Sequence, residues 1–205
     1  GNFVVFYDGE PLLIDVGSGT YTKKTFGSRR YEIWYNCSDY HNLPTVNGKT
    51  QFAGREYQAS NVKYQASDNS VQYSLDISKA FPNDAGINSL QRTIQYKRGK
   101  QVMLTDVFNL RKAEQITEHF MTVYPAEVIN PGQLVIHYQN ETGDKKDFIL
   151  RYDARKMSPK IEKIKFETEE DQGVLKKWGD RIYRINFEFI SPKMKDQASF
   201  VISAK

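Results

Sequence analysis

The stretch Thr93–Phe108, TIQYKRGKQVMLTDVF, decides the fold class of this 205-residue chain. Its two halves are rich in β-branched, aromatic and aliphatic residues, and the polar sequence Lys97–Lys100 lies between them. Such residues favour strands, and Gly99 supplies the backbone freedom that a tight turn needs. The stretch therefore predicts a β-hairpin that turns at Gly99.

Strand-like segments continue on both sides of this hairpin. Val71–Leu75 alternates cleanly between apolar and polar residues, and Tyr31–Tyr35 alternates in part. Further predicted strands are Asn2–Tyr7, Ile116–Val123, Gln133–Tyr138, Phe148–Tyr152, Ile161–Glu167, Ile182–Phe189 and Phe200–Ser203. Turn-forming residues separate them at Asn130–Gly132, Glu141–Asp144, Ser158–Pro159, Trp178–Asp180 and Ser191–Pro192. Many short strands at regular spacing predict an all-β sandwich or barrel.

Few segments favour a helix. Ser78–Phe81 predicts a single turn closed by Pro82, and the acidic run Glu169–Asp171 before Gly173 is interpreted as a loop. The chain has no repeat of fixed period and no linker-like stretch. We therefore expect one domain over residues 1–205.

The charge pattern is that of a solvated surface. The 29 Lys and Arg are interleaved with 25 Asp and Glu, for a net charge of +4. This balance is compatible with an acidic glycan without predicting one, and no basic stripe indicates nucleic acid. No apolar run reaches the roughly 20 residues of a membrane span. The single Cys37 excludes an internal disulfide and is expected to be a small buried filler.

Two residues stand out as candidates for chemistry. His41 lies among polar and turn-forming residues, where a neutral imidazole can bind a metal if other ligands come close. Asp15 lies where an apolar segment meets the glycines of Val16–Gly19. An ordinary loop role is the alternative for both, because one Asp and one His, 26 positions apart (41 − 15), do not make a zinc site. His119 and His137 are expected to be ordinary strand residues.

Motifs of other enzyme classes are missing. The glycines of Gly17–Thr20 match neither a phosphate-binding loop nor a dinucleotide fingerprint, and no serine lies in a nucleophile elbow.

Three blocks give the chain a recognisable character: Gly1–Gly17 (GNFVVFYDGEPLLIDVG), Tyr40–Gln51 (YHNLPTVNGKTQ) and Arg98–Phe108 (RGKQVMLTDVF). Together they resemble the C-terminal domain of heparinase II/III-like polysaccharide lyases. The first is similar to the family's strand, turn and Asp-x-Gly, and the second to its His-Asn block followed by an Asn-Gly turn. The resemblance implies a large antiparallel β-sandwich, truncated here at its N-terminal edge, that packs against an N-terminal α-helical toroid of the same parent chain.

The resemblance also implies a function. Lyases of this family cleave uronic-acid polysaccharides by β-elimination: a base removes the proton at C5, and an acid protonates the leaving oxygen. Asp15 and His41 match two ligands of the family's zinc ion, whereas the third ligand and the catalytic residues match no position here. We therefore expect zinc to be structural, one ligand to be missing, and the chain to be inactive alone. Arg29 and Arg30 are candidates to contact an anionic sugar.

Several points stay open at this stage. Heparin-like glycosaminoglycans and alginate-like glycans are both compatible substrates, and the family resemblance alone implies periplasmic or secreted localisation. A non-catalytic carbohydrate-binding sandwich that uses Tyr and Trp side chains as flat contact surfaces is an alternative function. A purely structural or interaction domain is another.

Overall fold

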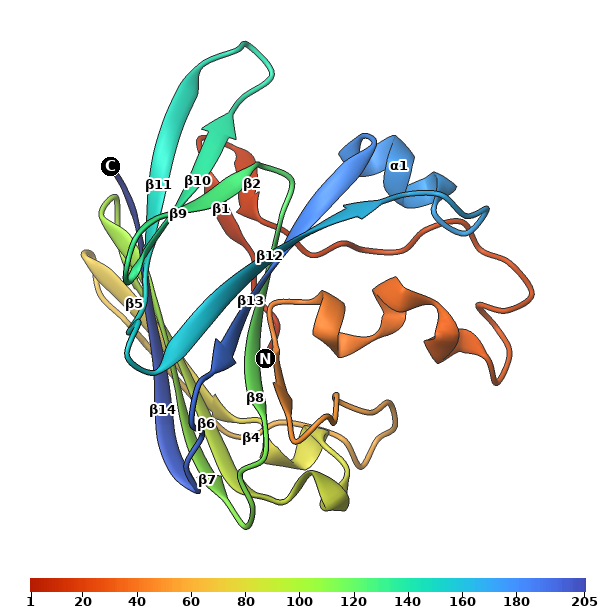
Figure 1. The fold of residues 1–205 in the computed structure, drawn as a ribbon, viewed down its shortest axis with the longest axis vertical. Helices are drawn as coiled ribbons and strands as arrows, with labels where there is room; N and C mark the ends of the chain where they lie inside the picture. The colour runs from red at the N-terminus through yellow and green to blue at the C-terminus, as the bar shows by residue number, and fades with distance from the viewer.

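The computed structural model describes residues 1–205 and consists mainly of antiparallel strands (Figure 1). The strands are β1 (Val5–Tyr7), β2 (Glu10–Leu13), β3 (Pro44–Val46), β4 (Ser60–Ala66), β5 (Ser70–Asp76), β6 (Ile87–Lys97), β7 (Gln101–Leu110), β8 (Ile116–Thr122), β9 (Ala126–Asn130), β10 (Gln133–Gln139), β11 (Lys145–Arg151), β12 (Met157–Lys165), β13 (Arg181–Phe189) and β14 (Lys195–Ala204). The helical segments are the 3₁₀ turns η1 (Arg30–Glu32), η2 (Trp34–Asn36), η3 (Ser38–Tyr40), η4 (Ser78–Ala80) and η5 (Asn83–Ala85), and the α-helix α1 (Gln172–Trp178). None of these helices has the length and apolar character of a membrane span.

The predicted hairpin is the centre of the larger sheet. β6 and β7 pair in antiparallel register, with Tyr96 opposite Val102 and Lys97 opposite Gln101. Gly99 has a φ of +67°, in the left-handed region that the tight turn requires. Strands add to both sides of this pair, and the sheet has the order β4-β5-β6-β7-β14-β11-β10-β9. The hairpin prediction is therefore confirmed.

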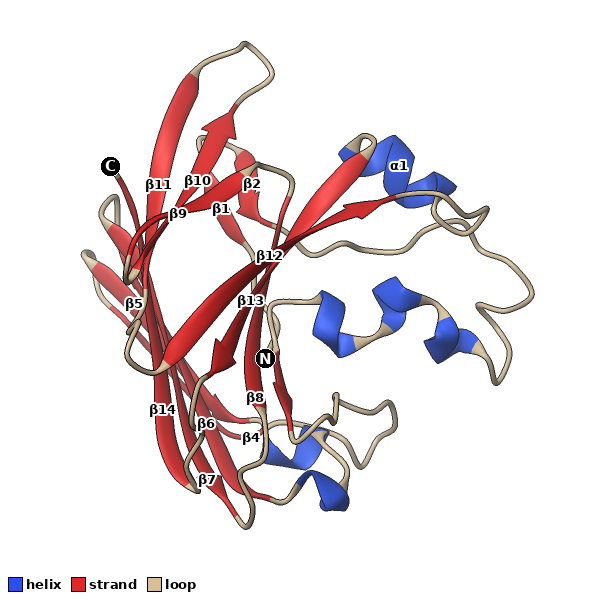
Figure 2. Cartoon of the chain, in the orientation of Figure 1, coloured by secondary structure: helices blue, strands red, loops and turns tan.

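A second sheet, with the order β12-β13-β8-β3, packs against the larger one and closes a sandwich (Figures 1 and 2). The main core contains 28 buried residues, contributed mainly by both sheets and also by the small β1–β2 hairpin and the η4–η5 segment. Phe120 of β8, Phe187 of β13 and Phe200 of β14 meet in its centre, with ring centroids 4.8–5.8 Å apart. The all-β sandwich prediction is confirmed.

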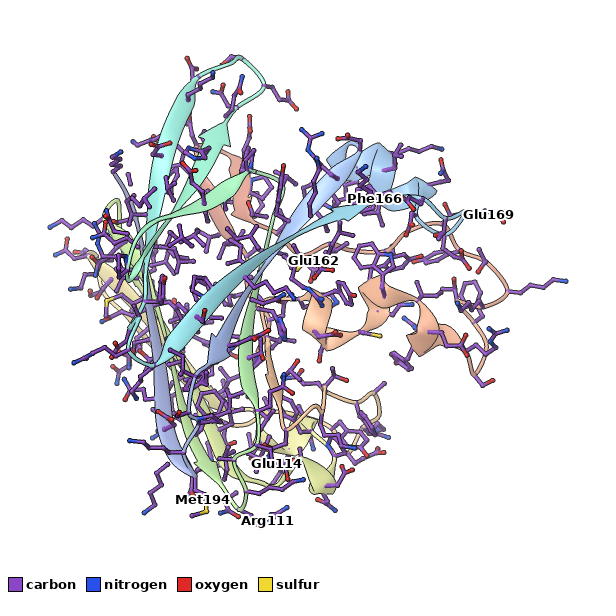
Figure 3. All side chains as sticks on the ribbon, in the orientation of Figure 1. Arg111, Glu114, Glu162, Phe166, Glu169 and Met194 are labelled. Carbon is purple, nitrogen blue, oxygen red and sulfur yellow. The ribbon has the colours of Figure 1, made fainter.

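A smaller core lies behind the second sheet and fixes the loops that carry the candidate residues. Its eight buried residues are Ile14, Val16, Ile33, Tyr35, Met121, Phe166, Val174 and Ile182. Phe166, labelled in Figure 3, follows β12 near α1 and stacks on Trp34 at an interplanar angle of 8°. The segment between β2 and β3 has no sheet of its own, so this core holds it in place.

The structure differs from the local predictions in several places. Tyr31–Tyr35 was expected to be a strand but forms parts of η1 and η2, because Ile33 and Tyr35 turn into the smaller core and the backbone bonds locally, as from Cys37 N–H to Trp34 O (2.9 Å). The acidic run Glu169–Asp171 is a loop, as expected, but Asp171 is the N-cap of α1, a helix that was not predicted. Strands β2, β3, β4 and β9 were not anticipated.

The predicted turn at Ser158–Pro159 is also wrong, since both residues lie within β12. β12 is an edge strand of the smaller sheet, where proline is tolerated because one side of the strand needs no N–H donor. The opposite edge strand, β3, begins with Pro44. The single turn expected at Ser78–Phe81 is confirmed as η4.

Candidate functional site

The fold brings Asp15 and His41 together. His41 Nδ1 lies 3.5 Å from Asp15 Oδ2, although the two residues stand in separate loops. The His41 side chain is 19% exposed and the Asp15 side chain 43% exposed, so a ligand from solvent or from another chain segment can reach both. The sequence could not show whether Asp15 and His41 lie close together, and the structure places them side by side.

Buried neighbours set the direction of Asp15. Ile14 and Val16 are both fully buried in the smaller core, and the Ile14 N–H donates to Met121 O (2.9 Å). In extended backbone, alternate side chains point to opposite sides, so Asp15 points away from that core. The N–H of Gly17 donates to Asp15 Oδ1 (2.8 Å), and the Asn2 side-chain amide donates to Oδ2 (2.6 Å). These bonds fix the carboxylate.

His41 follows the 3₁₀ turn η3 and has an extended backbone. Its Nε2 lies 3.2 Å from Tyr35 O, which can only accept a hydrogen bond. Nε2 therefore carries a proton, and in the neutral ring the lone pair on Nδ1 faces Asp15. A cation placed between these two acceptors, which lie 3.5 Å apart, would interact favourably with both.

Electrostatics agree with this geometry. The hydrogen bond with His41 is the main cause that lowers the pKa of Asp15 below its usual value, and partial burial opposes it. The charge of His41 and the N–H of Gly17 add to the lowering. The Asp15 carboxyl group is therefore charged at neutral pH.

The pair lies in an open depression with mixed polar and apolar walls. Gln51 and Phe52 line the same depression. The side-chain nitrogen of Gln51 is buried without a hydrogen-bond partner, so an unused amide group lines the same depression as the pair. The complete lining is Asn2, Asp15, Tyr31, Asn36, Ser38, His41, Leu43, Gln51, Phe52 and Ala53.

The donor types and their spacing fit a zinc ion, but the number of ligands does not. Two ligands of a tetrahedral zinc ion stand about 3.4 Å apart when each bond is about 2.1 Å, close to the observed spacing of Nδ1 and Oδ2. The Nε2–H bond to a backbone carbonyl is the usual outer contact that orients a metal-binding histidine. No group of three or more His, Cys, Asp or Glu side chains is placed to hold a metal. The structure thus supplies two ligands of a three- or four-ligand site.

The paired arginines lie apart from this depression. Arg29 and Arg30 are both exposed near η1. Arg29 is engaged by Glu32, with Nε 2.9 Å from both carboxylate oxygens and Nη2 2.7 Å from Oε2. No salt bridge of this kind holds the Arg30 guanidinium, which leaves Arg30 as the freer cation.

The other singled-out residues have structural roles. His119 is buried in β8 between Asn186 Oδ1 (2.7 Å from Nδ1) and Thr45 Oγ1 (2.8 Å from Nε2). His137 is a half-exposed strand residue beside Asp147, 2.9 Å from Nδ1. Cys37 is only half-buried rather than enclosed, and burial raises the pKa of its thiol. None of the three reaches the Asp15–His41 pair.

Three residues that build the site were assigned no role from the sequence. Asn2 and Gln51 line the depression, and Asn42, 1% exposed, bonds the loops on both sides of it. Asn42 directly follows His41, so a buried asparagine in a polar loop was the available signal. Its partners lie 28 to 79 positions away, which no local pattern reveals.

The sequence matches no protein-family profile and no curated protein. Solved structures match over 100% of this chain. The heparan sulfate lyase HepC of Pedobacter heparinus matches with a TM-score of 0.71 and 14% identity. A heparinase III gene product matches with a TM-score of 0.70 and 17% identity, and a further heparinase III with 0.64 and 16%.

This chain spans only about 30% of the length of those proteins, and it corresponds to their C-terminal region. At such low sequence identity, the structural similarity establishes the fold alone. The fold is that of the heparinase C-terminal β-sandwich domain, as the resemblance implied.

Proposed function

We propose that this chain is the C-terminal domain of a polysaccharide lyase that cleaves uronic-acid-containing glycans by β-elimination. The observation that carries the proposal is the meeting of Asp15 and His41 at 3.5 Å, inside a fold shared with heparan sulfate lyase and heparinase III. The resemblance to this family, drawn from the sequence without the structure, selected these two residues as ligands. A chance pair of loop residues has no reason to meet with a metal-like spacing and an oriented ring.

The metal proposed here is zinc, with a structural role. Zinc would join the loop of Asp15 to the loop of His41, and a third protein ligand would come from outside residues 1–205. Asn2 and Tyr35 orient the two ligands by hydrogen bonds to Asp15 Oδ2 and His41 Nε2. No residue of this chain is assigned to proton abstraction, so the chain alone is expected to be inactive.

The partners follow from the same proposal. An N-terminal α-toroid of the parent chain would supply the catalytic acid and base and would face the depression around Asp15 and His41. The substrate would be an acidic polysaccharide, either a glycosaminoglycan or an alginate-like glycan, and the protein would act in the periplasm or outside the cell. Arg30, and less so Arg29, would contact its carboxylates.

Zinc content of the parent protein tests the metal assignment. We expect one zinc ion per chain in the wild type and its loss in both Asp15→Ala and His41→Ala. His137→Ala is the matched control, because His137 and Asp147 form a second Asp–His pair, 2.9 Å apart, on the larger sheet. A wild-type parent without zinc, or zinc kept in both variants, contradicts the assignment.

The lyase activity needs a separate experiment. The parent protein should convert uronic-acid polysaccharides into unsaturated ends that absorb ultraviolet light, and residues 1–205 alone should not. Failure of the parent on heparan sulfate, heparin and alginate alike would refute the lyase proposal while leaving the zinc result intact.

A second candidate function is non-catalytic glycan binding, and one surface feature favours it. A groove between β1 and the β6–β7 turn has Phe6 (60% exposed) and Tyr96 (40% exposed) among its residues, together with Lys100 and Lys146. Aromatic faces with cations beside them suit an acidic sugar. The two tryptophans do not contribute, because the indole N–H of Trp34 bonds Asp171 and that of Trp178 bonds Val16. Two results together would favour this candidate: the parent protein binds the glycan but forms no unsaturated products, and Tyr96→Ala abolishes the binding.

A further inference from the structure

β4 is the least covered strand of the sandwich. Six of its seven residues are exposed, and it forms an outer edge of the larger sheet, so only β5 pairs with it. The opposite outer strand, β9, differs because it lies beside β12 of the smaller sheet. One side of β4 is therefore free along its length.

The backbone of β4 alternates between bonding β5 and facing outward. Ser67, just after β4, donates its N–H to Ser70 O (2.8 Å) across the β4–β5 turn. In an antiparallel pair every second residue bonds its neighbour, so Gln65 and Lys63, two and four positions before Ser67, also bond β5. The residues between and beside them therefore present their N–H and C=O groups at the free edge: Val62, Tyr64 and Ala66.

The side chains of the same residues lie on the inner face of the larger sheet. Tyr64 is paired with Tyr73, and Tyr73 with Ile94. Ile94 is in turn paired with Leu104, which belongs to the main core, and residues directly opposite each other share one face of a sheet. Tyr64 is 65% exposed, Val62 53% and Tyr73 38%. The inner face therefore continues beyond the core as an uncovered aromatic surface.

We propose that two copies of this chain pair through β4 in an antiparallel arrangement whose two-fold axis passes through Tyr64. Tyr64 then lies opposite Tyr64 of the partner subunit, and Val62 lies opposite Ala66 of the partner subunit. All three outward-facing residues thus form hydrogen-bonded pairs, with two backbone hydrogen bonds in each pair. The pairing is independent of the metal and glycan sites proposed above.

Charge favours this register over the neighbouring ones. Lys63 is the only charged residue of β4, and it faces the neutral Gln65 of the partner subunit in this pairing. An axis at Lys63 would put two lysines directly opposite each other, which is destabilising. An axis at Gln65 would bring Val62 opposite Asp68, which lies beyond the end of the strand. The axis at Tyr64 avoids both faults.

The contact is short, so the dimer should be weak. A bulge at Asn61, whose φ is +52°, bends the start of β4 and confines the pairing to Val62–Ala66. Two strands of this length bury less than the roughly 1,200 Å² of a stable interface. The row of Tyr73, Tyr64 and their two copies adds aromatic cross-strand contacts on the inner face. We therefore expect a reversible dimer that forms at high protein concentration.

Sedimentation velocity of the 205-residue chain, from micromolar to millimolar concentration, tests the dimer. The wild type should change from monomer to dimer. Tyr64→Pro should abolish the dimer, because proline removes the outward N–H at the two-fold axis and leaves the hydrogen bonds between β4 and β5 intact. Tyr64→Phe keeps both the N–H and the ring and should dimerise like the wild type. A wild type that stays monomeric, or a dimer that survives in Tyr64→Pro, overturns the proposal.

Cross-linking tests the register and decides the question if Tyr64→Pro does not fold. Lys63 and Gln65 of the partner subunit would form a pair without backbone hydrogen bonds, at a Cα spacing that a disulfide can span. A mixture of Lys63→Cys and Gln65→Cys chains should therefore cross-link under mild oxidation, and neither variant should do so alone. A mixture that does not cross-link, or Lys63→Cys chains that cross-link with each other, overturns the proposal.

Discussion

Glu118 Oε2 lies 3.2 Å from Arg92 Nη2, and both side chains are fully buried. Arg92 also pairs with Asp106, so one buried cation faces two carboxyl groups. Burial is the main cause that raises the pKa of Glu118 well above its usual value, and the charge of Asp106 raises it further. Glu118 therefore holds its proton to a higher pH than an exposed glutamate does, and its Oε1 has no hydrogen-bond partner.

Replacing this glutamate by its neutral amide should raise stability at alkaline pH. The folded chain keeps the Glu118 proton to a higher pH than the unfolded chain, so wild-type stability falls as the pH rises above the usual value of about 4.3. The loss is about 1.4 kcal/mol per pH unit until the folded-state pKa is reached. Glu118→Gln removes this loss, and its advantage in urea unfolding should be larger at pH 8 than at pH 5. The exposed Glu114→Gln is the control, and equal advantages at both pH values would contradict a neutral Glu118.

His119 should give the opposite pH dependence. Burial lowers its pKa to about 4 against a usual value of about 6.5, so the unfolded chain binds this proton first as the pH falls. Wild-type stability should therefore decrease between about pH 6.5 and about pH 4 through this residue, by about 1.4 kcal/mol per unit. His119→Gln loses the bonds to Thr45 and Asn186 and is less stable at pH 7, but its unfolding free energy should fall less steeply with acid. Parallel curves for the two proteins would refute the assignment.

Arg30 and Arg29 should differ in glycan binding. Glu32 neutralises Arg29 through close contacts, whereas Arg30 is not held in a salt bridge. If an acidic glycan binds at this surface, Arg30→Ala should weaken retention of the parent protein on immobilised heparan sulfate more than Arg29→Ala does. Thermal stability should be unchanged in both, because both side chains are exposed. If both variants are retained as strongly as the wild type, the surface around Arg29 and Arg30 does not bind the glycan.

Gly173 should not tolerate a side chain, although it lies inside α1. A Cβ at Gly173 would stand 2.6 Å from the carbonyl carbon of Gly19 and 2.8 Å from Thr20 N, both backbone atoms that cannot rotate away. Alanine has the better helix propensity, by about 1 kcal/mol, but the clash should outweigh it and destabilise the protein by about 1–3 kcal/mol. Gly27→Ala is the control, since its nearest atom would be 3.4 Å away. Urea unfolding measures both, and a Gly173→Ala protein as stable as the wild type would contradict the predicted clash.

The fold could be predicted from the sequence where local pattern and tertiary packing agree. The Gly99 hairpin and strands such as β5 and β13 have the residue types and periodicity of strands. In the hairpin, each strand also pairs with its neighbour in the sequence. Tyr31–Tyr35 also has strand-forming residues. Burial of Ile33 and Tyr35 in the smaller core overrides that preference, and no local pattern reports a second core.

The site was predictable only in part for a similar reason. Asp15 and His41 carry suitable chemistry, but their approach depends on contacts that Asn42 makes with Ile14, Met121 and Arg92, which lie far from it along the chain. Spacing in the sequence does not encode such an approach. The family resemblance supplied the pairing, and the geometry shows how the core produces it.

Both free edges of the smaller sheet carry a proline, Pro44 in β3 and Pro159 in β12. A proline has no N–H with which to pair an added strand, and it interrupts the row of donors that an incoming chain would use. The sandwich is therefore poorly suited to grow by strand addition at either side of this sheet. Self-association of the folded protein into extended β assemblies would have to begin at the larger sheet, where β4 and β9 form the outer strands.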